Sequence, residues 1–185
     1  AIEAFGIQED AEKKLEVALG GVSKELLAQA SALQQLSTFG DETIIGVQAS
    51  IAAFTDNEQA IARATEATLD MAAATGMDLK AAGDLVAKSL GSSTNALSRY
   101  GIEVTGAVGS TERLDTLVGN IADKFAGQAA AAAETMAGQM QQASNAAGDA
   151  AESFGELLAP RVVEVAGLLK DGAEAVIEFI DSFSY

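Results

Sequence analysis

The sequence predicts an all-α protein in which a compact bundle of short antiparallel helices is followed by one or two long Ala-rich helices. Three observations support this fold class. Alanine, Leu, Glu and Gln dominate the composition, and these residues lose least on entering a helix, while the chain has one Pro. Capping residues recur at helix-length intervals through the first half of the chain. From Ser110 onward, apolar residues repeat every eleven positions.

The first two helices are defined by their ends. Residues 9–19 place apolar positions among charged neighbours, and Gly20 and Gly21 are suited to end that amphipathic helix. Ser23 is a cap for a second helix that runs to about Leu36, with Leu and Ala at spacings of three and four. The short connection implies that the two helices fold back on each other.

Two further helices follow the same logic. Asp41 is a natural N-cap for a third helix that extends to about Phe54. Thr55 with Glu58 matches a capping box for a fourth helix, which Gly76 is expected to end. Helices of this length joined by very short turns form a compact bundle.

The last part of the bundle contains a fifth helix and a short turn. Thr75 with Asp78 repeats the capping pattern before a helix that reaches about Leu90. The polar run 92–95 is suited to cap a short helical turn, which Gly101 would end in a left-handed conformation. Glycines at 106 and 109 then make the backbone more flexible, as in a linker. We therefore place the bundle domain at residues 1–106 and a long helical rod at residues 107–185.

The rod is predicted from three apolar columns of eleven-residue period. Eleven residues make three helical turns at about 3.67 residues per turn, so such columns form one nearly straight apolar seam, as in a straight or slightly right-handed coiled coil. We expect several copies to associate through this seam. The alternative is that the chain folds back at Pro160, with residues 162–183 packing on residues 114–125 of the same molecule. The predicted seam consists of Leu114, Val118, Ile121, Phe125, Met136, Met140, Phe154, Leu158, Val162, Val165, Leu169, Val176 and Ile180.

Pro160 interrupts this pattern at one point. A Pro inside a helix removes one hydrogen bond and clashes with the preceding turn, so we expect a kink or break at residues 157–159. The segment 126–151 is nearly half Ala and has Glu134 and Asp149 as its only charges. Such a thin, smooth helix allows close approach by a partner and depends on packing for its stability.

The composition argues against several classes of function. The chain has no His and no Cys, which removes the usual zinc, haem and thiol chemistry, and Ser92 and Ser93 have no His to activate them. No phosphate-binding glycine loop and no calcium loop is present. The formal net charge of -16 disfavours direct nucleic-acid binding. We expect no catalytic, cofactor or metal site, and no enzymatic activity.

Several ordered phrases resemble one protein family. The segment TGMDLKAAGDLVAKSLGSSTNALSRYGIEV, residues 75–104, resembles tail tape-measure proteins of long-tailed bacteriophages. Three further segments are similar to the same family: LQQLSTFGDETIIGVQASIAAFT (33–55), STERLDTLVGNIADKFAGQA (110–129) and GELLAPRVVEV (155–165). None of these phrases is a catalytic signature.

The resemblance implies a structural virion protein that occupies the tail tube lumen and sets how long the tail grows during assembly in the host cytoplasm. It also implies the tail tube protein and tail assembly chaperones as partners, and a part in genome ejection. Members of the family are usually far longer than 185 residues, so this chain would be one part of a ruler or a short relative.

A second hypothesis comes from a different class. The Ala-rich segment and residues 162–183 are apolar enough to suggest a membrane-active helical protein that aids genome passage through the host envelope. Two features disfavour membrane contact. The longest charge-free run, residues 43–55, is shorter than the roughly 20 residues that span a bilayer. Five acidic residues lie between positions 164 and 181. We therefore predict a soluble chain.

Overall fold

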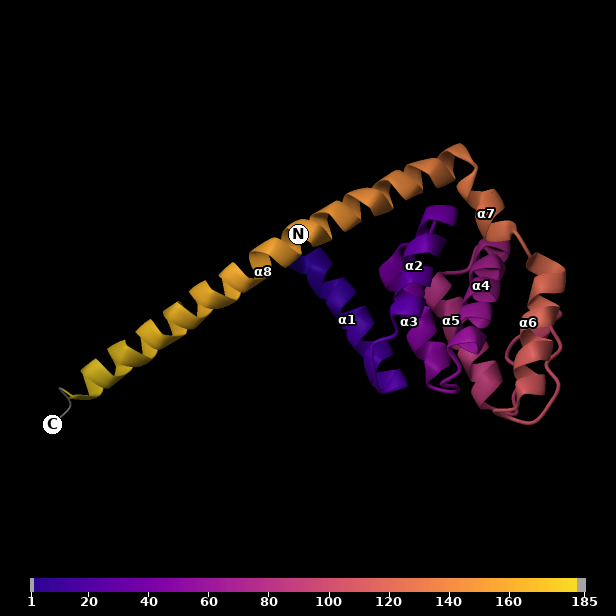
Figure 1. Ribbon diagram of the computed structural model, residues 1–185, viewed down its shortest axis with the longest axis horizontal. Coiled ribbons are helices and arrows are strands. Elements are labelled where there is room, and N and C mark those ends of the chain that lie inside the picture. The colour runs from indigo at the N-terminus through magenta and orange to yellow at the C-terminus, as the bar shows by residue number, and fades with distance from the viewer. Residues whose placement is uncertain (1, 183–185) are drawn as a thin grey trace. The chain divides into compact units, whose positions relative to one another are not determined.

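The computed structural model describes residues 2–182, with the side chains of residues 165, 168, 169 and 171–182 excluded. Within that range it consists of α-helices, one 3-10 turn and connecting loops, without strands, so the all-α prediction is confirmed (Figure 1). The chain divides into two units, which we describe separately. The bundle is Ile7–Ala147, and the second unit combines Ala1–Gly6 with Gly148–Tyr185.

Helices α2 and α3 begin close to where their capping residues place them, whereas the first helix begins seven residues before the predicted residue 9. Helix α1 spans Ile2–Leu19, α2 spans Lys24–Leu36 and α3 spans Asp41–Ala52. The Ser23 hydroxyl caps α2 by accepting from the Leu26 N–H at 3.2 Å. Asp41 is the first residue of α3 and its N-cap is Gly40, so the predicted cap is one residue late. The Asp41 N–H instead donates to the side-chain oxygen of Gln34 at 2.8 Å.

The next two helices are capped by acceptor side chains. Helix α4 spans Glu58–Thr75 and α5 spans Leu79–Gly91. Asn57, rather than the predicted Thr55, caps α4 by accepting from the Ala60 N–H at 3.0 Å, while Thr55 accepts from the Asn57 N–H. Gly76 ends α4 in a left-handed conformation with φ of +69°. Asp78 caps α5 by accepting from the Ala81 N–H at 3.0 Å, so the predicted cap Thr75, which is the last residue of α4, is wrong.

Helix α4 is the centre of the bundle and packs against α2, α3, α5, α6 and α7 (Figure 1). Its small residues let neighbouring backbones approach from several sides. Two buried threonines on α4 are satisfied within the helix: the Thr65 and Thr68 hydroxyls donate to the carbonyl oxygens of Ile61 and Ala64 at 2.8 and 2.6 Å. The largest fully buried side chains of the core are Leu15, Leu26, Ile44, Ile45, Ile51, Ile61, Leu69, Met71, Leu79, Leu97, Ile102 and Leu117.

The segment after α5 forms a short turn, as its polar run predicts. The 3-10 turn η1 spans Ser98–Tyr100 and ends at Gly101, whose φ is +70°. Asn95 organises it from both sides, since its side-chain oxygen accepts from the Leu97 N–H and its amide nitrogen donates to the Ile102 carbonyl at 2.9 Å. Leu97 and Ile102 are fully buried, so this turn closes part of the core.

Helix α6, Thr111–Phe125, belongs to the bundle, and this corrects the predicted boundary between residues 106 and 107. Leu114, Leu117, Val118 and Ile121 of α6 are buried in the same core as α4. Glycines at 106 and 109 therefore make a turn within one domain instead of a linker between two. The apolar face of α6 could have been covered by a neighbouring copy or by its own bundle, and the residue pattern alone does not distinguish the two.

A buried guanidinium fixes the place of α6. Arg113 donates from Nε to the Ser89 carbonyl at 2.6 Å and from its two terminal nitrogens to the carbonyls of Gly106 and Ser92 at 3.0 and 2.6 Å. Ser89 and Ser92 lie at the C-terminal end of α5, where carbonyl oxygens have no partner within their helix and the helix dipole favours a cation. One side chain thus joins α5, the following loop and α6.

Helix α7, Gln128–Ala133, is held to α4 by a carboxylate. The two oxygens of Asp70 accept from the N–H groups of Gly127 and Ala129 at 3.1 and 2.9 Å, so a residue of α4 caps α7 from outside. Gly127 has a φ of +80°, which breaks the helical path between α6 and α7. The predicted single rod from residue 110 is therefore three helices.

Helix α8 spans Met136–Ser182 and is 47 residues long. Thr135 starts it, since its hydroxyl accepts from the Gly138 N–H at 3.0 Å. The helix continues through Pro160, so a break at residues 157–159 is wrong, as is the alternative in which the chain folds back there, while the kink stays a prediction. A single Pro removes one hydrogen bond, and the good helix formers on both sides of Pro160 sustain the helix past it. Phe183, which that alternative included, lies outside the described residues.

Replacing Arg113 by Met should lower the free energy of unfolding by about 3 kcal/mol or more, because three carbonyl oxygens lose their donor in a buried site. Equilibrium unfolding in urea measures this loss. Arg63→Met is the matched control: Arg63 forms an exposed ion pair with Asp115 at 2.9 Å, and its loss should change stability by less than about 1 kcal/mol. Equal losses in the two variants would contradict the role assigned to Arg113.

Candidate functional site

The first turns of α8 are anchored on the bundle through two amide side chains. Gln142 donates from Nε2 to the carbonyls of Gln35 and Ser37 at 2.8 and 3.1 Å, and Asn145 donates to the Thr38 carbonyl at 3.4 Å. These carbonyls lie at and just beyond the C-terminal end of α2, where backbone acceptors need partners. One face of residues 136–147 is thereby fixed against the bundle.

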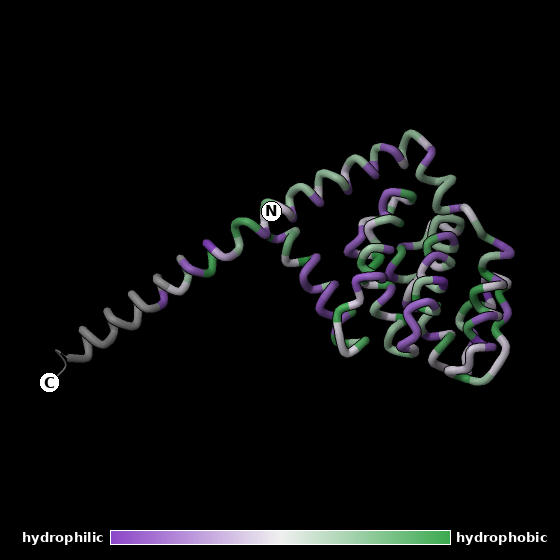
Figure 2. The backbone as a smooth tube through the Cα atoms, viewed as in Figure 1, coloured by the Kyte–Doolittle hydropathy of each residue, from purple (hydrophilic) through white to green (hydrophobic). Residues whose placement is uncertain are grey.

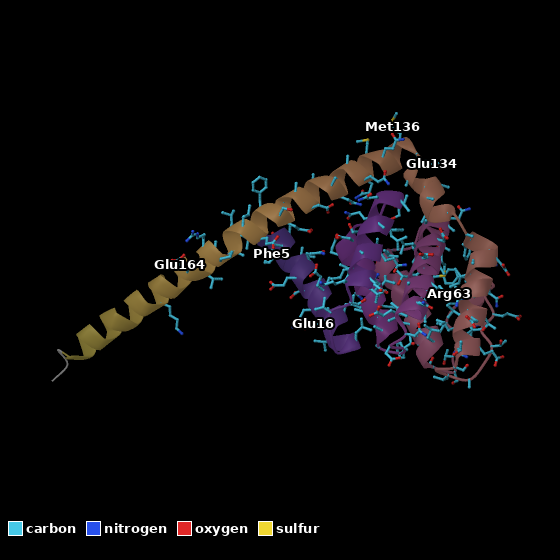
Figure 3. The ribbon with its side chains drawn as sticks, viewed as in Figure 1. Phe5, Glu16, Arg63, Glu134, Met136 and Glu164 are labelled. Atoms are coloured by element: carbon cyan, nitrogen blue, oxygen red, sulfur yellow. The ribbon has the colours of Figure 1, made fainter. Side chains whose placement is uncertain are left out.

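The opposite face of these turns carries large apolar side chains in solvent. At 3.6 residues per turn, Met136, Met140 and Ala143 lie roughly 100° to 180° around the helix from Gln142 and Asn145. Met136 is 81% exposed and Met140 is 72% exposed. Figure 3 shows the Met136 side chain at the start of α8 pointing away from the bundle. Nothing in the bundle covers this face.

Within the second unit, α8 also exposes large apolar side chains. Phe154 is 64% exposed, and Leu158 and Val162 are each 48% exposed. Leu157, at the edge of the face, is 73% exposed. Monomeric proteins rarely expose a contiguous apolar patch of more than a few hundred Å². We call the following set the apolar face of α8: Met136, Met140, Ala143, Ala147, Ala151, Phe154, Leu158 and Val162.

Charged residues avoid the apolar face over its described length. Glu152 and Glu156 fall on the opposite side of α8 by helical spacing. Arg161 borders the face and forms an exposed ion pair with Glu164 at 3.2 Å. Figure 2 shows hydrophobic and hydrophilic positions interspersed along the coloured part of α8, as expected for an amphipathic helix. This separation makes the face suitable for contact with another apolar surface.

The structure splits the predicted seam into three groups. Leu114, Val118 and Ile121 are buried in the bundle and Phe125 is partly buried against its core, so these four are not available to a partner. Their eleven-residue period identified the apolar face of each helix but not what covers it. Five members are exposed on α8 and lie on one face: Met136, Met140, Phe154, Leu158 and Val162. The other four lie outside the residues whose side chains the structure describes: Val165, Leu169, Val176 and Ile180.

Sequence reasoning missed the polar groups that orient this face. Gln142 and Asn145 are three residues apart and lie opposite the apolar columns. That spacing was the sequence feature from which a polar contact face could have been predicted. Asp70 and Arg113 gave no such signal, because most of their partners are distant along the chain. Asp70 accepts from residues 57 and 59 positions away, and Arg113 donates to residues 21 and 24 positions away as well as to Gly106.

The bundle also has an open groove of about 500 Å³. It lies between α1, α3 and the start of α5, with Asp10, Lys14, Glu42 and Lys80 on its walls. Lys80 donates to Asp84 at 2.9 Å, and this hydrogen bond raises the pKa of the Lys80 ammonium, which therefore stays charged at neutral pH. The mixed charges around an open groove do not converge on a reacting group.

Comparison with known proteins gives no relative. No protein-family model, no curated protein and no solved structure matches the chain. Over residues 2–182, no helix combines the length and the apolar character that a bilayer crossing needs. The functional argument therefore depends on the apolar face of α8 and on the sequence resemblance.

Gln142→Ala should speed hydrogen exchange of the amides of residues 139–147 by roughly tenfold, since two hydrogen bonds to the end of α2 are lost. Global stability should change little, because the buried core is untouched. Gln139→Ala is the control, because Gln139 lies on the same helix and its Nε2 donates to the Glu134 carbonyl at 3.5 Å instead of to α2. Equal exchange rates in both variants would show that Gln142 does not anchor α8.

Proposed function

We propose that this chain is a structural tail tape-measure protein, or a part of one, that occupies the tail tube and helps set tail length during assembly. The observation on which this depends most is α8, a 47-residue helix that presents an apolar face outside the bundle core. A helix converts sequence length into spatial length at about 1.5 Å per residue. The resemblance of residues 75–104 to tape-measure proteins supports the proposal that the length of this helix serves to measure tail length.

The resemblance and the fold fit together in one respect. Three of the resembling segments, 33–55, 75–104 and 110–129, fall in the bundle, whereas 155–165 falls in α8. We propose that the bundle is a folded module of the longer ruler and that α8 is a measuring segment attached to it. In this proposal the apolar face of α8 is covered by other copies or by the inner wall of the tube.

The proposed role is one of assembly, without catalysis. The absence of His and Cys from the sequence and the lack of convergent reactive groups in the groove support a structural role. The partners in this proposal are the tail tube protein and tail assembly chaperones, and the sites are the virion tail and, during assembly, the host cytoplasm. Direct binding to nucleic acid is not proposed, because the net charge is -16.

Tail length tests the ruler directly. Repeating residues 136–179 after residue 179 adds four eleven-residue periods and should lengthen the tail by about 66 Å, since each helical residue adds about 1.5 Å. Electron microscopy of assembled particles measures the change. A Gly/Ser insert with the same number of residues at the same place is the control, because it lacks a fixed rise per residue. Tails of unchanged length with the helical repeat would contradict the proposal.

A second candidate is a membrane-active role, favoured by the exposure of Phe154, Leu157 and Leu158. Glu152 and Glu156 on the other side of α8 disfavour it, because an interfacial helix usually carries Lys and Arg there to attract anionic lipid. Leakage of dye from anionic vesicles at neutral pH separates the two roles. We expect no leakage from the ruler, and leakage abolished by Phe154→Asp would favour the membrane role.

A further inference from the structure

A sharp turn separates α7 from α8, although the sequence there favours one continuous helix. Figure 1 shows the chain changing direction between the two helices. Residues 128–147 contain no Pro and consist mostly of Ala, Gln and Met, which are good helix formers. The eleven-residue apolar spacing also continues across the turn, from Ala129 to Met140. A period that stays in phase over this distance is what a single helix requires.

Gly138 permits the turn by letting the start of α8 lie against the backbone of α7. A Cβ at position 138 would overlap the carbonyl oxygen of Ala132 and come within 2.8 Å of the Ala133 Cα. A continuous helix has room for a Cβ at every position, and in a helix interior Ala is more favourable than Gly. The absence of a side chain at position 138 is therefore needed by the bent form and is unfavourable for a straight one.

The first turns of α8 are held to the bundle mainly by polar contacts. Among residues 136–147, Gly138 is buried, Gln142 and Asn145 are half-buried, and the other side chains are exposed. The two amides donate to carbonyls at the end of α2. Such neutral hydrogen bonds contribute little net free energy, because water satisfies the same groups when they separate. This part of α8 can therefore leave α2 without exposing a large apolar side chain.

A straight form would gain backbone hydrogen bonds in return. The first N–H groups of a helix have no acceptor within it, and the Gly138 N–H uses the Thr135 hydroxyl instead. In one continuous helix, the N–H groups of residues 136–138 would bond to the carbonyl oxygens of residues 132–134. Helix α7 would be the nucleus, since Asp70 holds its first turn on α4 and extending a helix costs less than starting one.

We propose that the turn between α7 and α8 is a hinge, and that the chain exchanges between this bent form and a straight form in which residues 128–147 are one helix. In the straight form Gln142 and Asn145 leave the end of α2, and the first turns of α8 extend along the axis of α7. The hinge stores the start of α8 against the bundle and releases it. This inference goes beyond the proposed function and does not depend on it.

Gly138→Ala tests the hinge, because the added Cβ is excluded from the bent form and favours the straight helix. The chain has no Cys, so Gln35→Cys and Ser144→Cys place two spin labels at exposed positions on α2 and α8. Double electron–electron resonance should show mainly the short distance of the bent form. Gly138→Ala should raise the ratio of long to short distances at least about tenfold. Gly148→Ala is the matched control, since a Cβ there has no neighbour within 4 Å. Equal distance distributions in the two variants would overturn the inference.

Hydrogen exchange separates a straight helix from a start of α8 that has only come loose. In Gly138→Ala the amides of residues 136–138 should exchange more slowly than in the unaltered chain, because they gain carbonyl acceptors. Adding Met136→Pro should remove this protection and keep the long distances, since Pro fits the first position of α8 but not the interior of a continuous helix. Faster exchange of these amides in Gly138→Ala, or protection that survives Met136→Pro, would overturn the hinge.

Discussion

The buried guanidinium of Arg113 is the interaction on which the arrangement of the second half of the bundle depends. It donates to carbonyls at the end of α5 and in the following loop, and so fixes where α6 begins. With α6 in place, its apolar residues pack on α4, and Asp70 of α4 can cap α7. The chain then leaves α7 at a position where Gln142 reaches the end of α2. A short series of polar contacts therefore determines how α8 starts and which of its faces is free.

The function proposed for the chain follows from what α8 leaves uncovered. In the bundle, helices α1 to α7 all contribute buried apolar residues to one core. On α8 the large side chains of the same residue pattern are exposed at Met136, Met140, Phe154, Leu158 and Val162. Exposing an apolar face of this length to water is unfavourable in free energy. We therefore expect another surface to cover it. Assembly with copies of itself or inside a tube supplies that surface.

Much of the fold was predictable from local chemistry. Ser23, Gly76 and Gly101 specify their helix ends through a side-chain acceptor or a left-handed conformation, and the structure places those ends where expected. The N-cap of α4 is Asn57 instead of the predicted Thr55. Both side chains accept from nearby N–H groups, so either could serve as the cap, and the two possible helix starts differ by only two residues. Continuation through Pro160 was not predictable, because one lost hydrogen bond is small against the rest of a long helix.

The candidate site was predictable only in part. The eleven-residue columns identified Met140, Phe154 and Leu158 as members of one face, and the structure exposes all three. The same columns also contained Leu114 and Ile121, which are buried in the bundle. Periodicity reports which side of a helix is apolar, whereas the covering surface depends on contacts between distant segments, such as that of Arg113 with Ser89. Those contacts have no local signature.

Hydrogen exchange as a function of protein concentration tests the central claim, that an apolar face of α8 is left for another molecule to cover. The account predicts that peptides from residues 148–162 become protected as concentration rises through the micromolar range, while peptides from α4 are protected equally at all concentrations. Protection of residues 148–162 that does not change with concentration in the isolated chain would contradict it.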